Sequence, residues 1–225
     1  MPSKDHASHM EWNFEPVSDP QELTYNASNP PDNASTDVDY EPHPEASIPL
    51  SSSRAAIVKS VTNLYSGSCQ EGGTGEQDLK VYAPEAVYDD PWSYCDTRYK
   101  IAGQWYGVPK LFDSKTLATE VVENSDNAHT TPGEDARIVF KLRQEYTIKA
   151  VRISKAVNSL ISLTLQNIDG EEKVRFHKDQ WNHKDYSHEG LGRAMKELNG
   201  DHLTKITRPP GWLKEGAESK GVPTS

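Results

Sequence analysis

Two adjacent carboxylates, Asp89 and Asp90, are the first residues in this chain whose types and spacing suggest chemistry. They precede Pro91, and a residue before proline is held in an extended conformation, so Asp90 is expected in a strand or at its end. Neighbouring strand residues point to opposite faces, so one aspartate should face the interior. A carboxylate in an apolar cavity has a raised pKa and can act as a base or acid near neutral pH. A structural role is equally compatible with the pattern, with Asp90 capping the turn at Pro91.

A second polar row lies on the last predicted strand, where four side chains alternate and share one face: His177, Asp179, Trp181 and His183. Histidine suits proton transfer because its pKa lies near neutrality, so His177 or His183 is a candidate proton partner that also orients Asp90. The alternatives are a structural role and a metal site, which would need further ligands from elsewhere. We expect neither a metal nor a cofactor.

Aromatic residues surround both polar groups in sequence or in the expected fold. Tyr and Trp bring apolar area with a polar end, which suits a pocket for an aromatic or polycyclic ligand. The candidate ligand-binding residues are Asp89, Trp92, Trp105, Tyr106, Phe140 and Trp181, and the candidate hydrogen-bond donors are Tyr94 and Tyr106. The alternative is that part of this aromatic set simply fills the interior.

Charge and proline content divide the chain into three parts. Residues 1–50 hold ten acids, one base and eight of the 15 prolines, so they carry −9 of the net charge of −10. Such a segment buries too little apolar surface to offset its ordering entropy, which predicts a disordered acidic tail. Residues 51–207 are predicted to form one domain and residues 208–225 a flexible tail, although Trp212 and Leu213 have the apolar area to pack back.

Residues 51–225 carry 23 bases and 24 acids, without a basic stripe, which argues against nucleic-acid binding. No apolar run of about 18 residues exists, so no membrane span and no membrane partner are expected. The N-terminus lacks the basic and apolar regions of a secretory signal, and two cysteines are too few for a disulfide scaffold. These features predict a cytoplasmic protein with reduced thiols.

The apolar spacing changes along the chain from a helical period to a strand period, which is an α+β pattern. A helix over 51–65 begins at a serine cluster and ends at Gly67, and Asp169-Gly170 is a hairpin signal. Further helices are predicted over 76–82, 101–112 and 189–198, and strands over 86–90, 117–123, 136–149, 157–167 and 173–183.

The order of these elements and the stretch Tyr82-Ala-Pro-Glu-Ala-Val-Tyr-Asp-Asp-Pro91 resemble the nuclear transport factor 2-like superfamily. Within it, the SnoaL-like group and the ketosteroid isomerases are most similar, over residues 54–185. The stretches 101–107 and 181–188 are similar to a fungal branch. This resemblance implies an α+β cone, in which a strongly curved antiparallel sheet wraps around N-terminal helices and leaves a pocket at one end. It also implies pairing of two copies through the outer sheet face.

In ketosteroid isomerases the aspartate of the Asp-Pro pair is the general base, and it matches Asp90 here. The family's donor tyrosine falls near Ser60, and its second acid falls within residues 160–163, where this chain has no carboxylate. The steroid isomerase machinery is therefore incomplete.

The resemblance implies a small-molecule pocket protein, acting as a cofactor-free acid/base isomerase, dehydratase or cyclase on an apolar substrate. Asp90 would be the base, His177 or His183 the proton partner and Tyr94 a hydrogen-bond donor. The alternative is a non-catalytic binding or dimerisation module with a regulatory acidic tail.

Overall fold

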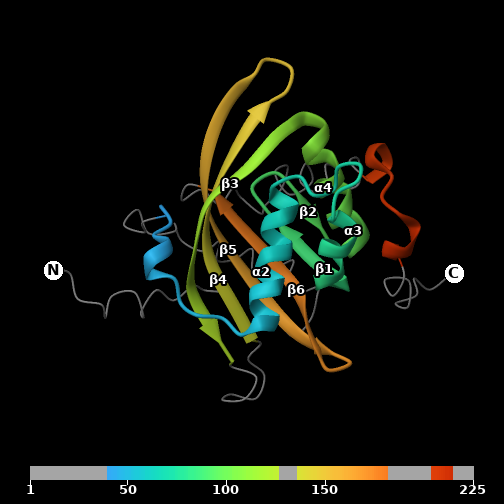
Figure 1. Cartoon of the computed structure of the whole chain (residues 1–225). Helices are drawn as coiled ribbons and strands as arrows, with labels where there is room; N and C mark the ends of the chain where they lie inside the picture. The colour runs from blue at the N-terminus through green and yellow to red at the C-terminus, as the bar shows by residue number, and fades with distance from the viewer. Residues whose placement is uncertain (1–39, 127–135, 182–203, 215–225) are drawn as a thin grey trace, which may run out of the picture.

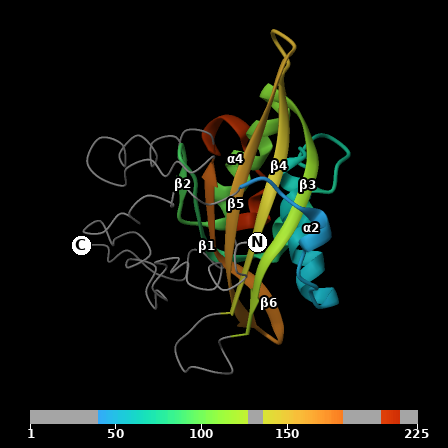
Figure 2. The same cartoon turned by 90° about the vertical axis from the view of Figure 1, so that its left-hand side faces the viewer.

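The computed structural model describes residues 40–126, 136–181 and 204–214 of the chain. One curved six-stranded sheet, with strand order β2-β1-β6-β5-β4-β3, covers helices on its concave side (Figures 1 and 2). Its strands are β1 (Tyr82–Asp89), β2 (Tyr94–Cys95), β3 (Phe112–Ser125), β4 (Ala136–Ile148), β5 (Ile153–Ile168) and β6 (Glu171–Trp181). The predicted α+β fold with a strongly curved sheet is confirmed.

The sheet is mixed, which corrects the expectation of a wholly antiparallel sheet. Strands β1 and β6 run parallel, with Asp89 opposite Lys178, while the other neighbouring pairs are antiparallel. Parallel neighbours need a long crossover connection. Here the whole stretch from β2 to β5, including a helix, separates β1 from β6 in the chain.

Two longer helices lie against the sheet, α2 (Ser52–Tyr65) and α4 (Arg98–Leu111). Between α2 and β1 the chain forms α3 (Gly75–Asp78) and the 3-10 turn η3 (Leu79–Val81). Strand β1 therefore begins at Tyr82, four residues before the predicted strand, and the predicted helix over 76–82 is divided between α3 and η3. The remaining short turns are η2 (Pro44–Ala46) and η4 (Gly211–Lys214).

Helix α2 is fixed at both ends, which sets the position of its last residue, Tyr65. The Ser51 side chain accepts a hydrogen bond from the backbone N–H of Arg54, and Gly67 takes a left-handed φ of 80° just past the helix end. The buried guanidinium of Arg54 also pairs with Glu172 of β6 at 2.7 Å. One face of α2 is buried against the sheet as its spacing predicted, through Ile57, Val61, Leu64 and Tyr65.

The alternation along β1 places the two aspartates as expected. Tyr88 and Asp90 face the interior, while Asp89 faces the outer side of the sheet and pairs there with Lys178. The hairpin predicted at Asp169-Gly170 connects β5 and β6. The predicted helix over 189–198 lies outside the described residues.

Both ends of the packed region extend beyond the predicted boundaries at 51 and 207. Tyr40 is buried against Val139 and Leu160 on the outer face of the sheet. Leu213 is fully buried in the main core. In each case a short segment buries a large apolar side chain, which stabilises the fold. The polar composition of the surrounding residues did not indicate this burial. Among the described residues, no helix has the length and apolar character needed to cross a bilayer.

Candidate active site

His177 of β6 lies at the centre of a buried polar group. Its Nδ1 is 2.8 Å from the Tyr82 hydroxyl, and its Nε2 is 3.2 Å from the Tyr65 hydroxyl. The two tyrosines come from β1 and α2, so the histidine connects the sheet to the first long helix. Since both ring nitrogens are engaged by hydroxyls, neither is available to a metal ion in this arrangement.

Asp179 follows two residues later on the same face of β6 and is fully buried. Its Oδ2 accepts hydrogen bonds from the Tyr65 hydroxyl at 2.7 Å and from Trp181 Nε1 at 2.8 Å. Its other oxygen, Oδ1, meets no donor at full hydrogen-bond geometry among the described residues, although the Ser159 hydroxyl is near enough to this carboxyl to lower its pKa. A buried carboxylate oxygen without a donor is costly, so Oδ1 is a natural acceptor for a group brought by a ligand.

These contacts fix the direction of the hydrogen bonds. Tyr65 has one proton, which it donates to Asp179, so towards His177 it must act as acceptor. We therefore assign the proton of the neutral imidazole to Nε2, which leaves Nδ1 to accept from Tyr82. The result is a chain of donors, Tyr82 to His177 to Tyr65 to Asp179, hereafter the hydrogen-bonded chain.

Burial determines how the members of this chain ionise. Desolvation raises the pKa of Asp179 to about 7, with a further increase from Asp90, while hydrogen bonds from Tyr65, Trp181 and Ser159 oppose the increase. Desolvation also lowers the pKa of His177 to about 3, so its imidazole is neutral. Burial raises the pKa of both Tyr65 and Tyr82, which keeps their hydroxyls protonated. Near neutral pH, Asp179 is the member of this chain that gains or loses a proton.

Asp90 is also buried, but its carboxylate is fully occupied by the turn that follows it. Oδ1 accepts from the backbone N–H groups of Trp92 at 2.7 Å and Ser93 at 2.5 Å, and Oδ2 accepts from the Tyr88 hydroxyl at 2.7 Å. Burial raises its pKa above the usual range, while these three hydrogen bonds oppose the increase. Asp90 thus has the capping geometry that the structural interpretation predicted, and it also holds the Tyr88 hydroxyl.

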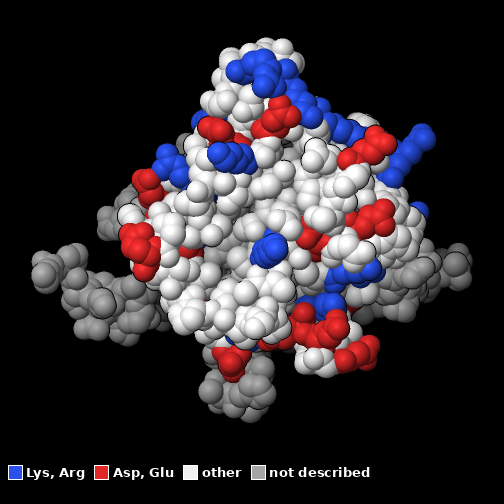
Figure 3. All heavy atoms as spheres, viewed as in Figure 1, with Lys and Arg blue, Asp and Glu red and all other residues white. Residues whose placement is uncertain are grey.

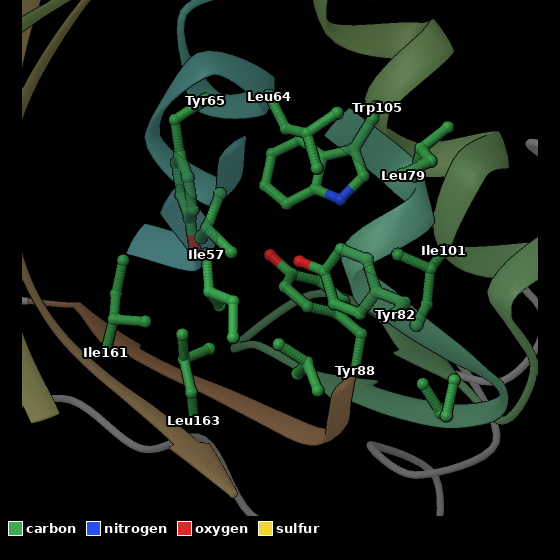
Figure 4. Close-up of a cluster of buried hydrophobic side chains, with 14 of the residues drawn as sticks. Ile57, Leu64, Tyr65, Leu79, Tyr82, Tyr88, Ile101, Trp105, Ile161 and Leu163 are labelled. Atoms are coloured by element: carbon green, nitrogen blue, oxygen red, sulfur yellow. The ribbon is translucent and has the colours of Figure 1, made fainter. Parts of the chain in front are cut away.

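Aromatic rings from α4 and β1 pack against the hydrogen-bonded chain (Figure 4). Trp105 of α4 packs 4.6 Å from the Tyr65 ring, and Tyr88 of β1 meets the His177 ring edge-on at 4.8 Å. In the close-up, the Trp105 indole nitrogen faces the interior where the Tyr82 and Tyr88 hydroxyls converge. The Trp105 N–H does not reach full hydrogen-bond geometry with any described residue, but it is close enough to the Tyr82 hydroxyl to act on that group as a donor and lower its pKa against the effect of burial.

The aromatic residues continue from Asp179 to the molecular surface. Trp181, which donates to Asp179, is half-buried, and its ring meets that of Trp92 edge-on at 5.2 Å. Trp92 itself is 63% exposed. This pair of tryptophans thus connects the buried carboxylate with an exposed side chain by direct contacts.

The remaining predicted residues lie at different distances from this site. Tyr94 is half-buried on β2 opposite Asp89, and Phe140 is buried in the core on β4. Tyr106 lies near Cys69 and Glu76, and burial raises its pKa to about 12. His183 lies outside the described residues. The structure therefore brings His177, Trp105 and Trp181 together, with Asp90 joined to them through Tyr88.

Sequence reasoning did not select three residues of the hydrogen-bonded chain: Tyr65, Tyr82 and Asp179. Asp179 was visible as a member of the alternating row on β6. It also stands opposite Ile161 of β5, within the stretch 160–163 that matches the position of the family's second acid. Tyr65 was assigned only to the apolar face of its helix, since periodicity does not reveal where a hydroxyl at the edge of that face points.

A ketosteroid isomerase-like protein from Erwinia carotovora atroseptica is 14% identical with a TM-score of 0.48, over 57% of this chain and 92% of that one. This chain is similar in fold to ketosteroid isomerase-like proteins. A protein with a ketosteroid isomerase-like fold from Catenulispora acidiphila is 13% identical with a TM-score of 0.40, over 53% and 82% of the two chains.

A third similar structure is a phenazine biosynthesis-related protein from Pseudomonas aeruginosa, 14% identical with a TM-score of 0.39, over 57% of this chain and 80% of that one. No family model and no curated protein matches the sequence. A shared fold does not transfer an activity, so the function must be argued from the site.

Proposed function

We propose that this protein is a cofactor-independent acid/base enzyme, an isomerase or lyase that moves a proton on a small apolar molecule, with Asp179 as the base. The observation that carries the proposal is Oδ1 of Asp179, an acceptor that meets no donor at full hydrogen-bond geometry among the described residues, on a carboxyl whose pKa is raised to about 7. A general base is most effective when its pKa lies near the working pH.

In the proposed reaction, Oδ1 of Asp179 takes a proton from a carbon of the substrate, and the electron pair of the broken C–H bond moves into the substrate. The carboxyl then returns this proton to another carbon in an isomerisation, or to a departing oxygen in a dehydration. Tyr65 and Trp181 hold Oδ2 throughout, which aims Oδ1. His177 stays neutral and keeps the Tyr65 hydroxyl directed at the carboxylate.

Negative charge that develops on the substrate needs a donor in the same dry interior. The Trp105 N–H is such a donor, since it is buried beside the Tyr65 ring and does not reach full hydrogen-bond geometry with the Tyr82 hydroxyl that it faces. A substrate oxygen near Trp105 would therefore gain a hydrogen bond that the protein alone does not make. This argues for an apolar molecule carrying one carbonyl or similar acceptor.

The base is assigned to Asp179 in preference to Asp90, the residue favoured from the sequence. Both carboxyls are buried, but each oxygen of Asp90 already accepts a hydrogen bond from its own turn or from Tyr88. Taking up a proton there would disrupt the turn at Pro91. Asp90 is therefore proposed as a positioning residue that holds Tyr88 against His177.

A non-catalytic module is the second candidate, favoured by the structural use of Asp90. If two copies pair through the outer sheet face, the interface has to accommodate residues 40–48. This segment is held there by the bond from the Ile48 N–H to the Val121 carbonyl at 2.8 Å and by Tyr40 against Leu160.

Proton transfer can be tested before a substrate is known. Small apolar ketones are incubated with the protein in heavy water, and deuterium uptake at carbon is followed by mass spectrometry. We expect protein-dependent uptake with at least one ketone, loss of uptake in Asp179→Asn, and no loss in the matched control Asp169→Asn, which alters an exposed hairpin carboxylate. Uptake that persists in Asp179→Asn, or its absence with every ketone while one is bound, supports the non-catalytic module instead.

A further inference from the structure

The turn between β4 and β5 projects beyond the helices (Figure 1). At this end of the molecule the exposed side chains are unusually apolar for a hairpin tip. Val151 is 58% exposed and Ile153 62%, and Ile148 and Leu111 beside them are 41% and 58% exposed. The Leu111 carbonyl accepts a hydrogen bond from the Lys149 N–H at 3.1 Å, which joins the end of α4 to the hairpin. These four apolar residues thus form one surface.

Positive charge surrounds these apolar side chains. Figure 3 shows Lys and Arg gathered over the projecting end of the hairpin. The exposed cations are Lys110, Lys115, Lys149, Arg152 and Lys155. Two acids lie among them: Asp113 pairs with Arg152 at 2.7 Å and with Lys149 at 3.5 Å, and Glu145 stands opposite Lys115. The surface is therefore positive although the whole chain carries a net charge of −10. The four apolar residues and five cations are called the hairpin patch below.

The hairpin patch is continuous with the concave face of the sheet that holds the candidate site. Ile148 and Ile153 stand opposite each other, and Ile148 shares its face with Tyr146, two residues earlier on β4. Tyr146 packs edge-on against Phe112 at 5.7 Å. Its pKa is raised by burial and by the nearby Asp179 and Asp90 carboxylates. An apolar strip thus connects the tip to the surroundings of Asp179.

We propose that the hairpin patch docks on an anionic lipid surface. Exposed aliphatic side chains bordered by Lys and Arg are what an interfacial contact needs, since the aliphatic groups enter the boundary of the acyl chains and the cations meet negative headgroups. The charge of the patch, opposite in sign to that of the chain, argues for an anionic surface over a neutral apolar one. The lack of a long apolar run argues against membrane-spanning helices alone, so peripheral contact is proposed here in place of the expectation of no membrane partner.

The test uses the full chain and vesicles in a flotation assay. One set of vesicles contains phosphatidylcholine alone and the other phosphatidylcholine with phosphatidylserine. We expect binding to the second set, weaker binding to the first, and release as the salt concentration rises, because salt screens the attraction between exposed cations and headgroups.

Variants separate the hairpin patch from general stickiness. Val151→Asp with Ile153→Asp should reduce vesicle binding at least about tenfold, and Arg152→Glu with Lys155→Glu should reduce it by about fivefold for each charge removed. Ile206→Asp is the matched apolar control, since Ile206 is 56% exposed on a different part of the surface. Lys59→Glu, on exposed α2, is the matched charge control. Circular dichroism establishes that each variant is folded.

Equal binding to both vesicle types, no binding to either, or unchanged binding in the folded patch variants would overturn the proposal. So would self-association at the hairpin patch without lipid binding, seen as a mass that falls to that of a single chain in the Val151→Asp, Ile153→Asp variant. Because vesicle binding is measured without substrate, the result is separate from the test of proton transfer.

Discussion

The Tyr65 hydroxyl lies 2.7 Å from Oδ2 of Asp179, and this hydrogen bond joins the end of α2 to the last strand of the sheet. Because Tyr65 donates its one proton here, His177 must donate to it in turn, and the hydrogen-bonded chain acquires one direction. The interior thus contains an ordered series of donors that ends at a carboxyl with one oxygen left over. A purely apolar core would need none of these groups.

The first prediction concerns the pH dependence of stability. The pKa of Asp179 is raised on folding, so its contribution to the free energy of unfolding is full below about pH 4 and is lost as the pH rises to about 7. Asp179→Asn removes this loss. Between those values, its free energy of unfolding should slope more positively with pH than that of the parent, by up to about 1.4 kcal/mol per pH unit.

The contribution of His177 to the pH dependence of stability should have the opposite sign to that of Asp179. Its pKa is lowered on folding, so its contribution is full above about pH 6.5 and is lost as the pH falls towards 3. His177→Gln should therefore give a more negative slope than the parent over this range. Urea unfolding at a series of pH values measures both variants, with Asp169→Asn as a control that keeps the parental slope. If both variants changed the slope in the same direction relative to the parent, the assigned ionisation states would be refuted.

Removing the Tyr65 hydroxyl should break the hydrogen-bonded chain in the middle. In Tyr65→Phe, Oδ2 of Asp179 loses one of its two donors and His177 Nε2 loses its acceptor. Buried groups left without partners cost about 1–3 kcal/mol, and the pKa of Asp179 should rise further because a hydrogen bond that lowered it is gone. Tyr106→Phe, which alters a half-buried tyrosine on α4, should leave both the stability and the pKa of Asp179 close to those of the parent.

The ion pair of Asp89 and Lys178 gives a prediction about the other side of the sheet. The two charges are 2.6 Å apart and almost fully buried. Lys178→Met removes the cation that lies beside a buried carboxylate and should reduce the free energy of unfolding by about 3–5 kcal/mol. Adding Asp89→Leu should recover much of this loss. Lys173→Met, which removes the partner of exposed Glu171, should cost less than about 1 kcal/mol. Equal losses in the two lysine variants would contradict this account.

Asp90 should respond to substitution as a turn cap. Asp90→Asn retains an oxygen for the Trp92 and Ser93 N–H groups, whereas Asp90→Ala retains none. The alanine variant should lose about 1–3 kcal/mol of stability and the asparagine variant less. If Asp179 is the base, Asp90→Asn should also keep most of the deuterium uptake that Asp179→Asn abolishes. Loss of uptake in a folded Asp90→Asn variant would return the role of base to Asp90.

Local patterns in the sequence were sufficient for much of the fold. Ser51 and Gly67 marked the ends of α2, Asp169-Gly170 marked a hairpin, and the spacing of apolar residues distinguished helices from strands. These signals act within a few residues. The parallel pairing of β1 with β6 involves residues about ninety positions apart, such as Asp89 and Lys178, and no local signal specifies it.

The site shows the same division between local and distant information. Alternation correctly predicted that one of Asp89 and Asp90 faces the interior and the other faces away, and it put His177, Asp179 and Trp181 on one face. It did not show which carboxyl would be satisfied by its neighbours. That depends on Tyr65, far away in the chain, and on the backbone N–H groups of a turn whose geometry the sequence only suggested.

The ionisation of Asp179 is the most direct test of the central claim. Carbon-13 NMR of the aspartate carboxyl groups, with the signal assigned by its absence in Asp179→Asn, follows the titration of this side chain alone. The account predicts a midpoint near pH 7. A midpoint near pH 4, the ordinary value for an exposed aspartate, would contradict it, since such a carboxyl would be neither dry nor poised as a base at neutral pH.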